Sequence, residues 1–215
     1  AFWLWWGDGA GRVLLELGSG SELGVFVPII EILEGGWPWI LFWPAGFILA
    51  CFSLNTRWSA WALSTQIIIA GSIFPLKMQL PWYSLPIWLP FSLLCGPPLS
   101  SLIQRDDNNY PLLRKILEKI PYLVSFVGFC LLVISLLVSF DLFNWAIPYS
   151  KIIFSIGIGW FLGGYLLSDS IIRVRKIGFI GIVLGSLIGL FILMNSKFWL
   201  WEINENWDVR PVAEF

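Results

Sequence analysis

Residues 150–196 read SKIIFSIGIGWFLGGYLLSDSIIRVRKIGFIGIVLGSLIGLFILMNS, two long apolar segments joined by a short polar connection. An α-helix needs roughly 20 apolar residues to cross the hydrocarbon layer of a membrane, and each segment is close to that length. Helices joined by so short a connection lie side by side and antiparallel. The pattern therefore predicts a hairpin of two membrane-spanning helices, at residues 147–167 and 177–196.

Small residues recur at every fourth position of both segments. They are Ser155, Gly159 and Gly163 in the first segment and Gly181, Gly185 and Gly189 in the second. Small side chains at this spacing form a groove in which two helix backbones approach closely. We predict that the two helices pack through these triplets, and that Ile182 and Ile188, which lie off them, tolerate replacement better. The alternative is that the stripe serves dimerisation or the docking of a lipid or pigment.

The composition of the whole chain has the same apolar character. Of its 215 residues, 58% are hydrophobic and 13% are charged, and the mean hydropathy is +0.80. Soluble domains carry about 25% charged residues, so this composition indicates an integral membrane protein. The formal net charge is −1 and there is no dense basic stripe, which argues against a nucleic-acid partner.

The sequence contains no histidine, which excludes His-ligated haem, most zinc and copper sites and a histidine general base. Cys51, Cys95 and Cys130 lie in apolar runs without CxxC spacing, so we interpret them as buried small hydrophobes. We assign no catalytic residue and no metal ligand. A membrane enzyme that uses Asp141 or Asp169 ranks last among the hypotheses, because neither carboxylate has an evident partner.

Four further apolar segments precede the hairpin, and the predicted fold is an all-α, polytopic integral membrane protein. The six predicted spans are 37–54, 60–79, 82–103, 121–140, 147–167 and 177–196. They form a transmembrane domain over residues 37–196. A Trp-rich segment, 1–36, precedes this domain and is expected to hold a short interfacial helix at 25–33. An acidic tail that also contains tryptophan, 197–215, follows it.

The third predicted span lies in a proline-rich stretch. Residues 74–98 read FPLKMQLPWYSLPIWLPFSLLCGPP and contain six prolines. Each internal proline removes a backbone donor, and in hydrocarbon the freed carbonyl must find another partner. We expect a kinked or partly re-entrant segment, which is either a distorted packing helix or a broken helix at a solute site. Gln66, Pro86 and Pro90 are the candidate solute or ligand contacts, although Gln66 can equally bond between helices.

The basic residues indicate an orientation. Eight of the thirteen lysines and arginines fall in the loops after spans one, three and five, and five fall in the longer regions on the other side. The positive-inside rule then places both termini in the periplasm or a lumen, in a bacterial inner membrane or a thylakoid-type membrane. Eleven of the fifteen tryptophans lie on that same outer side. The terminal segments contribute the candidate partner or lipid contacts, Trp3, Trp5, Trp6, Trp199, Trp201 and Trp207.

These patterns favour one class of function over another. The leading hypothesis is a non-enzymatic integral membrane subunit that docks in or stabilises a larger membrane complex, of a bioenergetic or pigment-binding kind. The alternative is a small-solute transporter component with a pocket near the proline-rich third span. Membrane lipids and other membrane subunits are the expected partners. No cofactor is predicted, and a bound pigment is compatible with the sequence.

Overall fold

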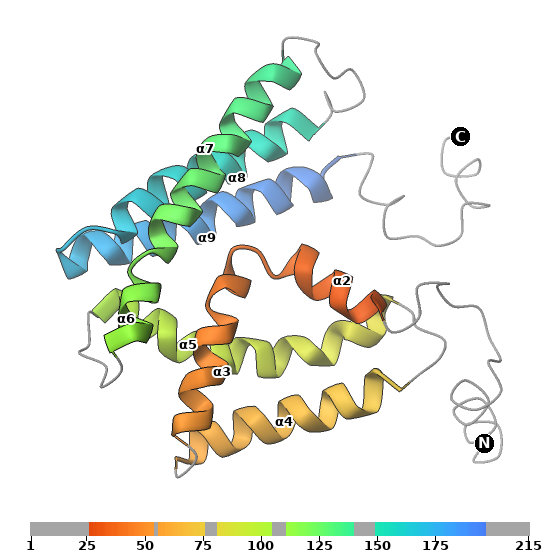
Figure 1. Ribbon diagram of the computed structural model, residues 1–215. Coiled ribbons are helices and arrows are strands. Elements are labelled where there is room, and N and C mark those ends of the chain that lie inside the picture. Colours follow the sequence, from red (N-terminus) through yellow and green to blue (C-terminus); the bar gives the residue numbers. More distant parts are fainter. Residues whose placement is uncertain (1–25, 54–55, 76–80, 105–110, 140–148, 197–215) are drawn as a thin grey trace, which may run out of the picture. The chain divides into compact units, whose positions relative to one another are not determined.

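The computed structural model describes residues 26–53, 56–75, 81–104, 111–139 and 149–196, and all of the regular secondary structure there is helical (Figure 1). The prediction of an all-helical chain is confirmed for these residues. The chain divides into two compact units. The first contains α2 to α5, the second contains α7 to α9, and the boundary passes through the short helix α6, Pro111–Leu117.

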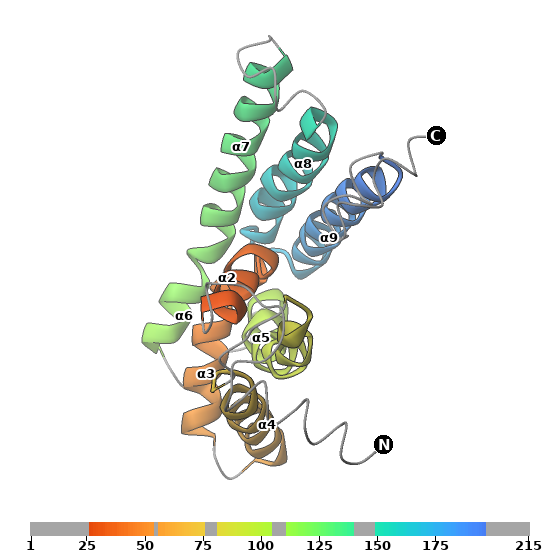
Figure 2. The same cartoon turned by 90° about the vertical axis from the view of Figure 1, so that its right-hand side faces the viewer.

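The second unit, called the three-helix unit below, consists of α7 (Ile120–Ser139), α8 (Ser150–Leu167) and α9 (Ile172–Met194). These helices form one layer, in which α8 lies between α7 and α9 and contacts both (Figures 1 and 2). The turn from α8 to α9 is held by Asp169: its carboxylate accepts a hydrogen bond from the Ile171 amide at 2.8 Å, and its carbonyl accepts one from the Arg175 guanidinium.

The first unit contains shorter elements. They are α2 (Phe26–Gly35), the 3-10 segment η1 (Trp39–Leu41), α3 (Trp43–Phe52), α4 (Arg57–Ile73), the 3-10 segment η2 (Pro81–Ile87) and α5 (Trp88–Gln104). The α3, α4 and α5 helices meet at a small core of Ala50, Ala62 and Leu94, each fully buried. Thr56 caps α4, because its hydroxyl accepts the Ser59 amide at 3.3 Å.

The two prolines inside α5 leave two carbonyls without their usual helical donors, and neighbouring helices of the first unit cover both of them. Pro97 has no N–H to offer the Leu93 carbonyl four residues before it, and the Trp58 indole of α4 donates to that carbonyl at 3.1 Å. Pro98 likewise leaves the Leu94 carbonyl, and the backbone of Gly46 in α3 lies directly against that oxygen. Neighbouring helices thus shield the proline-rich stretch, as an apolar environment requires.

Among the residues that the structure describes, four helices are long and apolar enough to cross a membrane: Ser84–Gln104, Leu113–Ser139, Ser150–Leu167 and Ile172–Met194. They overlap the third to sixth predicted spans, although Leu113–Ser139 and Ile172–Met194 begin before the predicted starts. The count becomes five if the pair Pro28–Gly35 and Trp39–Phe52, which is bent by 106°, forms one broken span. Both counts are below the predicted six.

The differences from the predicted spans have local causes. The 106° bend falls at the start of the first predicted span, whereas Ser84–Gln104 in the proline-rich third segment is one helix. That third segment changes from a 3-10 helix to an α-helix at Trp88. Pro90 lies in the first turn of α5, where backbone N–H groups have no partner within the helix, so it costs little. The α4 helix, which corresponds to the second predicted span, ends at Ile73. Its 17 residues, equivalent to about 25 Å, are fewer than the roughly 20 that a membrane-spanning helix needs.

Candidate functional site: a groove in the three-helix unit

The α8 and α9 helices approach so closely that their backbones touch. A Cβ atom added to Gly159 would lie 2.6 Å from the Cα of Gly185, and one added to Gly185 would lie 2.6 Å from the Cα of Gly159. Ser155 completes this contact by donating its hydroxyl proton to the Gly185 carbonyl at 3.1 Å. At these positions any side chain would push the two helices apart.

The other members of the predicted triplets differ from one another. Gly163 lies against the Gly178 carbonyl, 2.6 Å from where its Cβ would be, but a Cβ on Gly181 would make an ordinary contact at 3.5 Å. Gly189 faces the side chain of Ile156, which can move. Ile182 is 1% exposed and packs against Gly163, so the expectation that it lies outside this contact was wrong.

The residues of α9 that are buried against α8 explain why Gly181 makes only an ordinary contact and why Ile182 is packed. The buried residues of this helix are Arg175, Gly178, Ile182, Gly185 and Gly189, spaced alternately by three and four. Four residues turn a helix through about 400°, so a strict four-residue repeat drifts by about 40° at each step. Alternating steps of three and four stay on one face. Gly178 was missed by the sequence analysis, although this heptad-like spacing contained the signal for it.

A second seam of small residues joins α8 to α7. A Cβ on Gly164 would lie 2.6 Å from the Ser125 amide nitrogen, and one on Gly157 would lie 3.0 Å from the Leu132 amide nitrogen. Gly128 of α7 faces the α8 backbone in the same way. The Ser125 hydroxyl donates to the Phe161 carbonyl at 3.0 Å. The middle helix is therefore clamped between its two neighbours.

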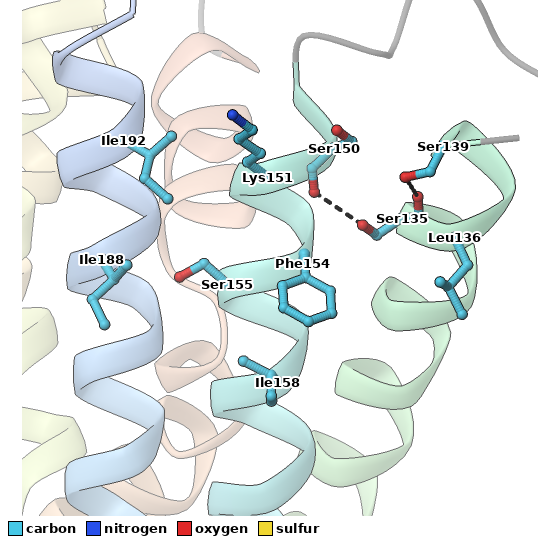
Figure 3. A pocket seen from close by; sticks show the side chains of 10 residues that line it. All are labelled: Ser135, Leu136, Ser139, Ser150, Lys151, Phe154, Ser155, Ile158, Ile188 and Ile192. Atoms are coloured by element: carbon cyan, nitrogen blue, oxygen red, sulfur yellow. Dashed lines mark hydrogen bonds between the residues drawn. The ribbon is translucent and has the colours of Figure 1, made fainter. Parts of the chain in front are cut away.

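The layer contains a groove at the end where α7 finishes and α8 begins (Figure 3). Its volume is about 550 Å³, within the usual range for a ligand site. Phe154 and Ile158 of α8 line it together with Leu136 of α7 and with Ile188 and Ile192 of α9. The polar lining residues gather toward one end, as Figure 3 shows. They are Ser135, Ser139, Ser150, Lys151 and Ser155.

Hydrogen bonds fix the polar end of this groove. The Ser135 hydroxyl donates to the Ser150 carbonyl at 2.9 Å, which ties the end of α7 to the start of α8. Ser139 donates back to the Ser135 carbonyl at 2.8 Å. The Lys151 side chain is exposed and has no ion-pair partner within the part of the chain that the structure describes. The Lys151 cation therefore stands with serines at one end of a groove whose remaining lining residues are apolar.

The candidate solute contacts lie in the other unit. Gln66 is on α4, and its Oε1 atom is buried with no hydrogen-bond partner among the described residues. Pro86, in η2, is exposed, and Pro90, in α5, is fully buried. The α4 helix contacts η2. The structure thus places Gln66 and Pro86 on adjoining elements, whereas Pro90 is a packing residue.

The remaining candidate contacts are the six terminal tryptophans, which lie outside the described residues, as does Asp141. Within the described ranges, no group of three or more His, Cys, Asp and Glu side chains could hold a metal ion. No known protein family, no curated protein and no solved structure matches the chain. Its class is given by its own helices, which are the only regular elements described and include four that are able to cross a membrane.

Proposed function

We propose that this chain is a polytopic membrane protein that serves as a non-enzymatic subunit of a larger membrane complex. In this proposal the chain crosses the membrane six times with both termini on the periplasmic or lumenal side, as the distribution of basic residues favours. Lipids cover part of its surface and other membrane subunits cover the rest. The observation that carries the proposal is an apolar stripe on α7.

This stripe, called the α7 stripe, follows the alternating spacing of a helix-packing seam and stays exposed, although its last member, Leu136, also lines the groove. Its members are exposed by 62, 62, 51, 38 and 55%, and they are Tyr122, Phe126, Phe129, Val133 and Leu136. Steps of four and three keep them on one side of the helix. Three of the five are aromatic, the residue class that is enriched at the centres of protein interfaces.

The inner side of the unit supports the same proposal. The seams around α8 are made by backbones in contact, so the layer is a rigid platform. Within the most apolar 18-residue stretches of α7, α8 and α9, only 22 to 28% of the residues are buried. Lipid or further helices must cover these exposed apolar faces, and the proposal assigns the aromatic α7 stripe to further helices.

The experiment compares two double variants of α7 in a tagged chain extracted gently from its native membrane. Tyr122→Ala with Phe126→Ala removes two aromatic anchors of the α7 stripe, each expected to contribute about 2 kcal/mol. Leu123→Ala with Ile134→Ala is the control, since both residues are 44% exposed but lie off the stripe. We expect a stoichiometric partner chain, measured by mass spectrometry, that the first variant loses and the control retains.

Two outcomes would reject the subunit proposal. One is that the wild-type chain is recovered in native-lipid particles alone or only with copies of itself. The other is that both double variants retain the partner equally. The topology is tested separately, by labelling single cysteines introduced at Ser19 and Asn206 in sealed cells. Labelling that requires permeabilisation at either position would contradict the proposed orientation.

A small-solute transporter component is the second candidate, and the buried Gln66 Oε1 atom favours it. A buried amide oxygen without a partner is costly unless a ligand or another group bonds to it. Uptake of a labelled primary amide into vesicles that contain the purified chain is the test. Saturable uptake by the wild-type chain that Gln66→Leu abolishes and Ser72→Ala leaves unchanged would favour the transporter over the subunit.

A further inference from the structure

The groove of the three-helix unit has the shape and polarity of an amphiphile. Phe154 and Ile158 follow one another along one face of α8, four residues apart, and they are 48 and 39% exposed. Lys151 precedes them on the same face. An apolar floor thus runs along the helix from a cation at its beginning, between α7 on one side and α9 on the other (Figure 3).

The groups at the polar end of the groove suit a negatively charged ligand. The Lys151 ammonium carries a full positive charge, and Ser150, the neighbouring residue at the start of α8, also lines this end (Figure 3). The N-terminal turn of an 18-residue helix adds a partial positive charge at the same place. The ligand that complements this end is an anion with oxygen atoms, and the ligand that complements the floor is a hydrocarbon chain.

We propose that this groove binds one anionic phospholipid, whose phosphate lies at Lys151 and Ser150 and whose acyl chain lies along Phe154 and Ile158. The inference rests on the proposed insertion in a membrane, where lysines near helix ends reach the level of the headgroups. A zwitterionic lipid would bring a second cation, that of its headgroup, close to Lys151, and a soluble anion would leave the apolar floor exposed to water. An anionic phospholipid meets both requirements at once.

The charge of the headgroup is tested with the purified full chain and two lipids of identical acyl composition, phosphatidylglycerol and phosphatidylcholine. Native mass spectrometry measures how much of each lipid stays bound. We expect wild-type chain to prefer phosphatidylglycerol, and Lys151→Gln to reduce this preference about fivefold, which corresponds to roughly 1 kcal/mol for one lysine at an anionic surface. Lys176→Gln, at an exposed lysine near the start of α9, is the matched control and should keep the preference.

The apolar floor is tested with two identical replacements on α9. Ile188→Trp places a large ring in the groove, and Ile180→Trp places the same ring about two turns earlier on α9, outside the groove lining; the two isoleucines are 51 and 52% exposed. Circular dichroism checks that both variants fold. We expect Ile188→Trp to abolish retention of the tightly bound lipid and Ile180→Trp to leave it intact.

Three results would overturn the lipid site. The first is equal retention of both lipids by the wild-type chain. The second is an equal loss of preference in Lys151→Gln and Lys176→Gln. The third is displacement of phosphatidylglycerol by an equal concentration of palmitate, which would assign the groove to a fatty acid. None of these depends on a partner chain, so the lipid site and the subunit proposal fail independently.

Discussion

The two units of this chain hold their helices together with different residues. In the three-helix unit, glycines and serines on both sides of α8 bring three long helices into contact along much of their length. In the first unit, α3, α4 and α5 meet around Ala50, Ala62 and Leu94, against which Trp43 and Trp58 pack, and the backbones of α3 and α5 approach closely at Gly46. Repeated small residues let long straight helices pack side by side, whereas tryptophan and proline confine the contact to a crossing point.

The polar groups within the two units differ in the same way. Serine hydroxyls cross both seams of the three-helix unit and bond to carbonyls that already belong to a regular helix, such as those of Phe161 and Gly185. In the first unit the Trp58 indole replaces a donor that Pro97 lacks. The serine hydroxyls therefore add a bond to carbonyls of a regular helix, whereas the Trp58 indole gives the Leu93 carbonyl the hydrogen bond that Pro97 cannot donate. Removal of the tryptophan bond should cost more.

The largest effect is expected where the α8 and α9 backbones touch. Gly185→Ala places a Cβ atom 2.6 Å from the Cα of Gly159 and should destabilise the three-helix unit by about 1–3 kcal/mol, the range for overpacking. Gly181→Ala is the control, because its Cβ would meet nothing closer than 3.5 Å. Reversible unfolding in bicelles measures both. Equal stability of the two variants would show that the packing of this unit does not depend on backbone contact.

An intermediate effect is expected for the hydrogen bond from the Trp58 indole to the Leu93 carbonyl in the first unit. Trp58→Phe keeps an aromatic ring but removes the N–H, so the Leu93 carbonyl loses its donor and stability should fall by about 1–2 kcal/mol. Pro97→Ala restores the backbone donor four residues after Leu93. In the Pro97→Ala background, Trp58→Phe should therefore cost much less. A double-mutant cycle measures this coupling, and strictly additive costs would contradict the role assigned to the indole.

The smallest effect is expected for a serine that crosses a seam. Ser155→Ala removes the bond to the Gly185 carbonyl, and such interhelical bonds contribute about 0.6 kcal/mol on average. Ser72→Ala is the control, because the Ser72 hydroxyl bonds to the Ile69 carbonyl of its own helix at 2.9 Å. The same unfolding assay separates them. A loss of stability in Ser155→Ala as large as that in Trp58→Phe would contradict the expectation that the Trp58 bond matters more than the Ser155 bond.

The sequence analysis succeeded where a property repeats along one helix. Hydrophobic length located α7, α8 and α9, and the spacing of small residues singled out Gly159 and Gly185. It missed the α7–α8 seam, because Gly128, Gly157 and Gly164 do not form a four-residue repeat and are meaningful only once α7 is known to lie beside α8. It also misjudged Ile182, because a strict four-residue repeat follows a drifting line rather than the buried face.

Composition and periodicity alone determined that this chain is helical, apolar and rich in segments of membrane-spanning length, because these properties depend on each segment's own residues. Only the tertiary structure decided which carbonyl the Trp58 indole reaches, which glycines face another backbone, and where Lys151 meets the apolar floor of a groove. Each of these features joins residues from different helices. Their positions depend on how helices pair and in what register, and the free energy that selects one pairing comes from contacts that no single segment contains.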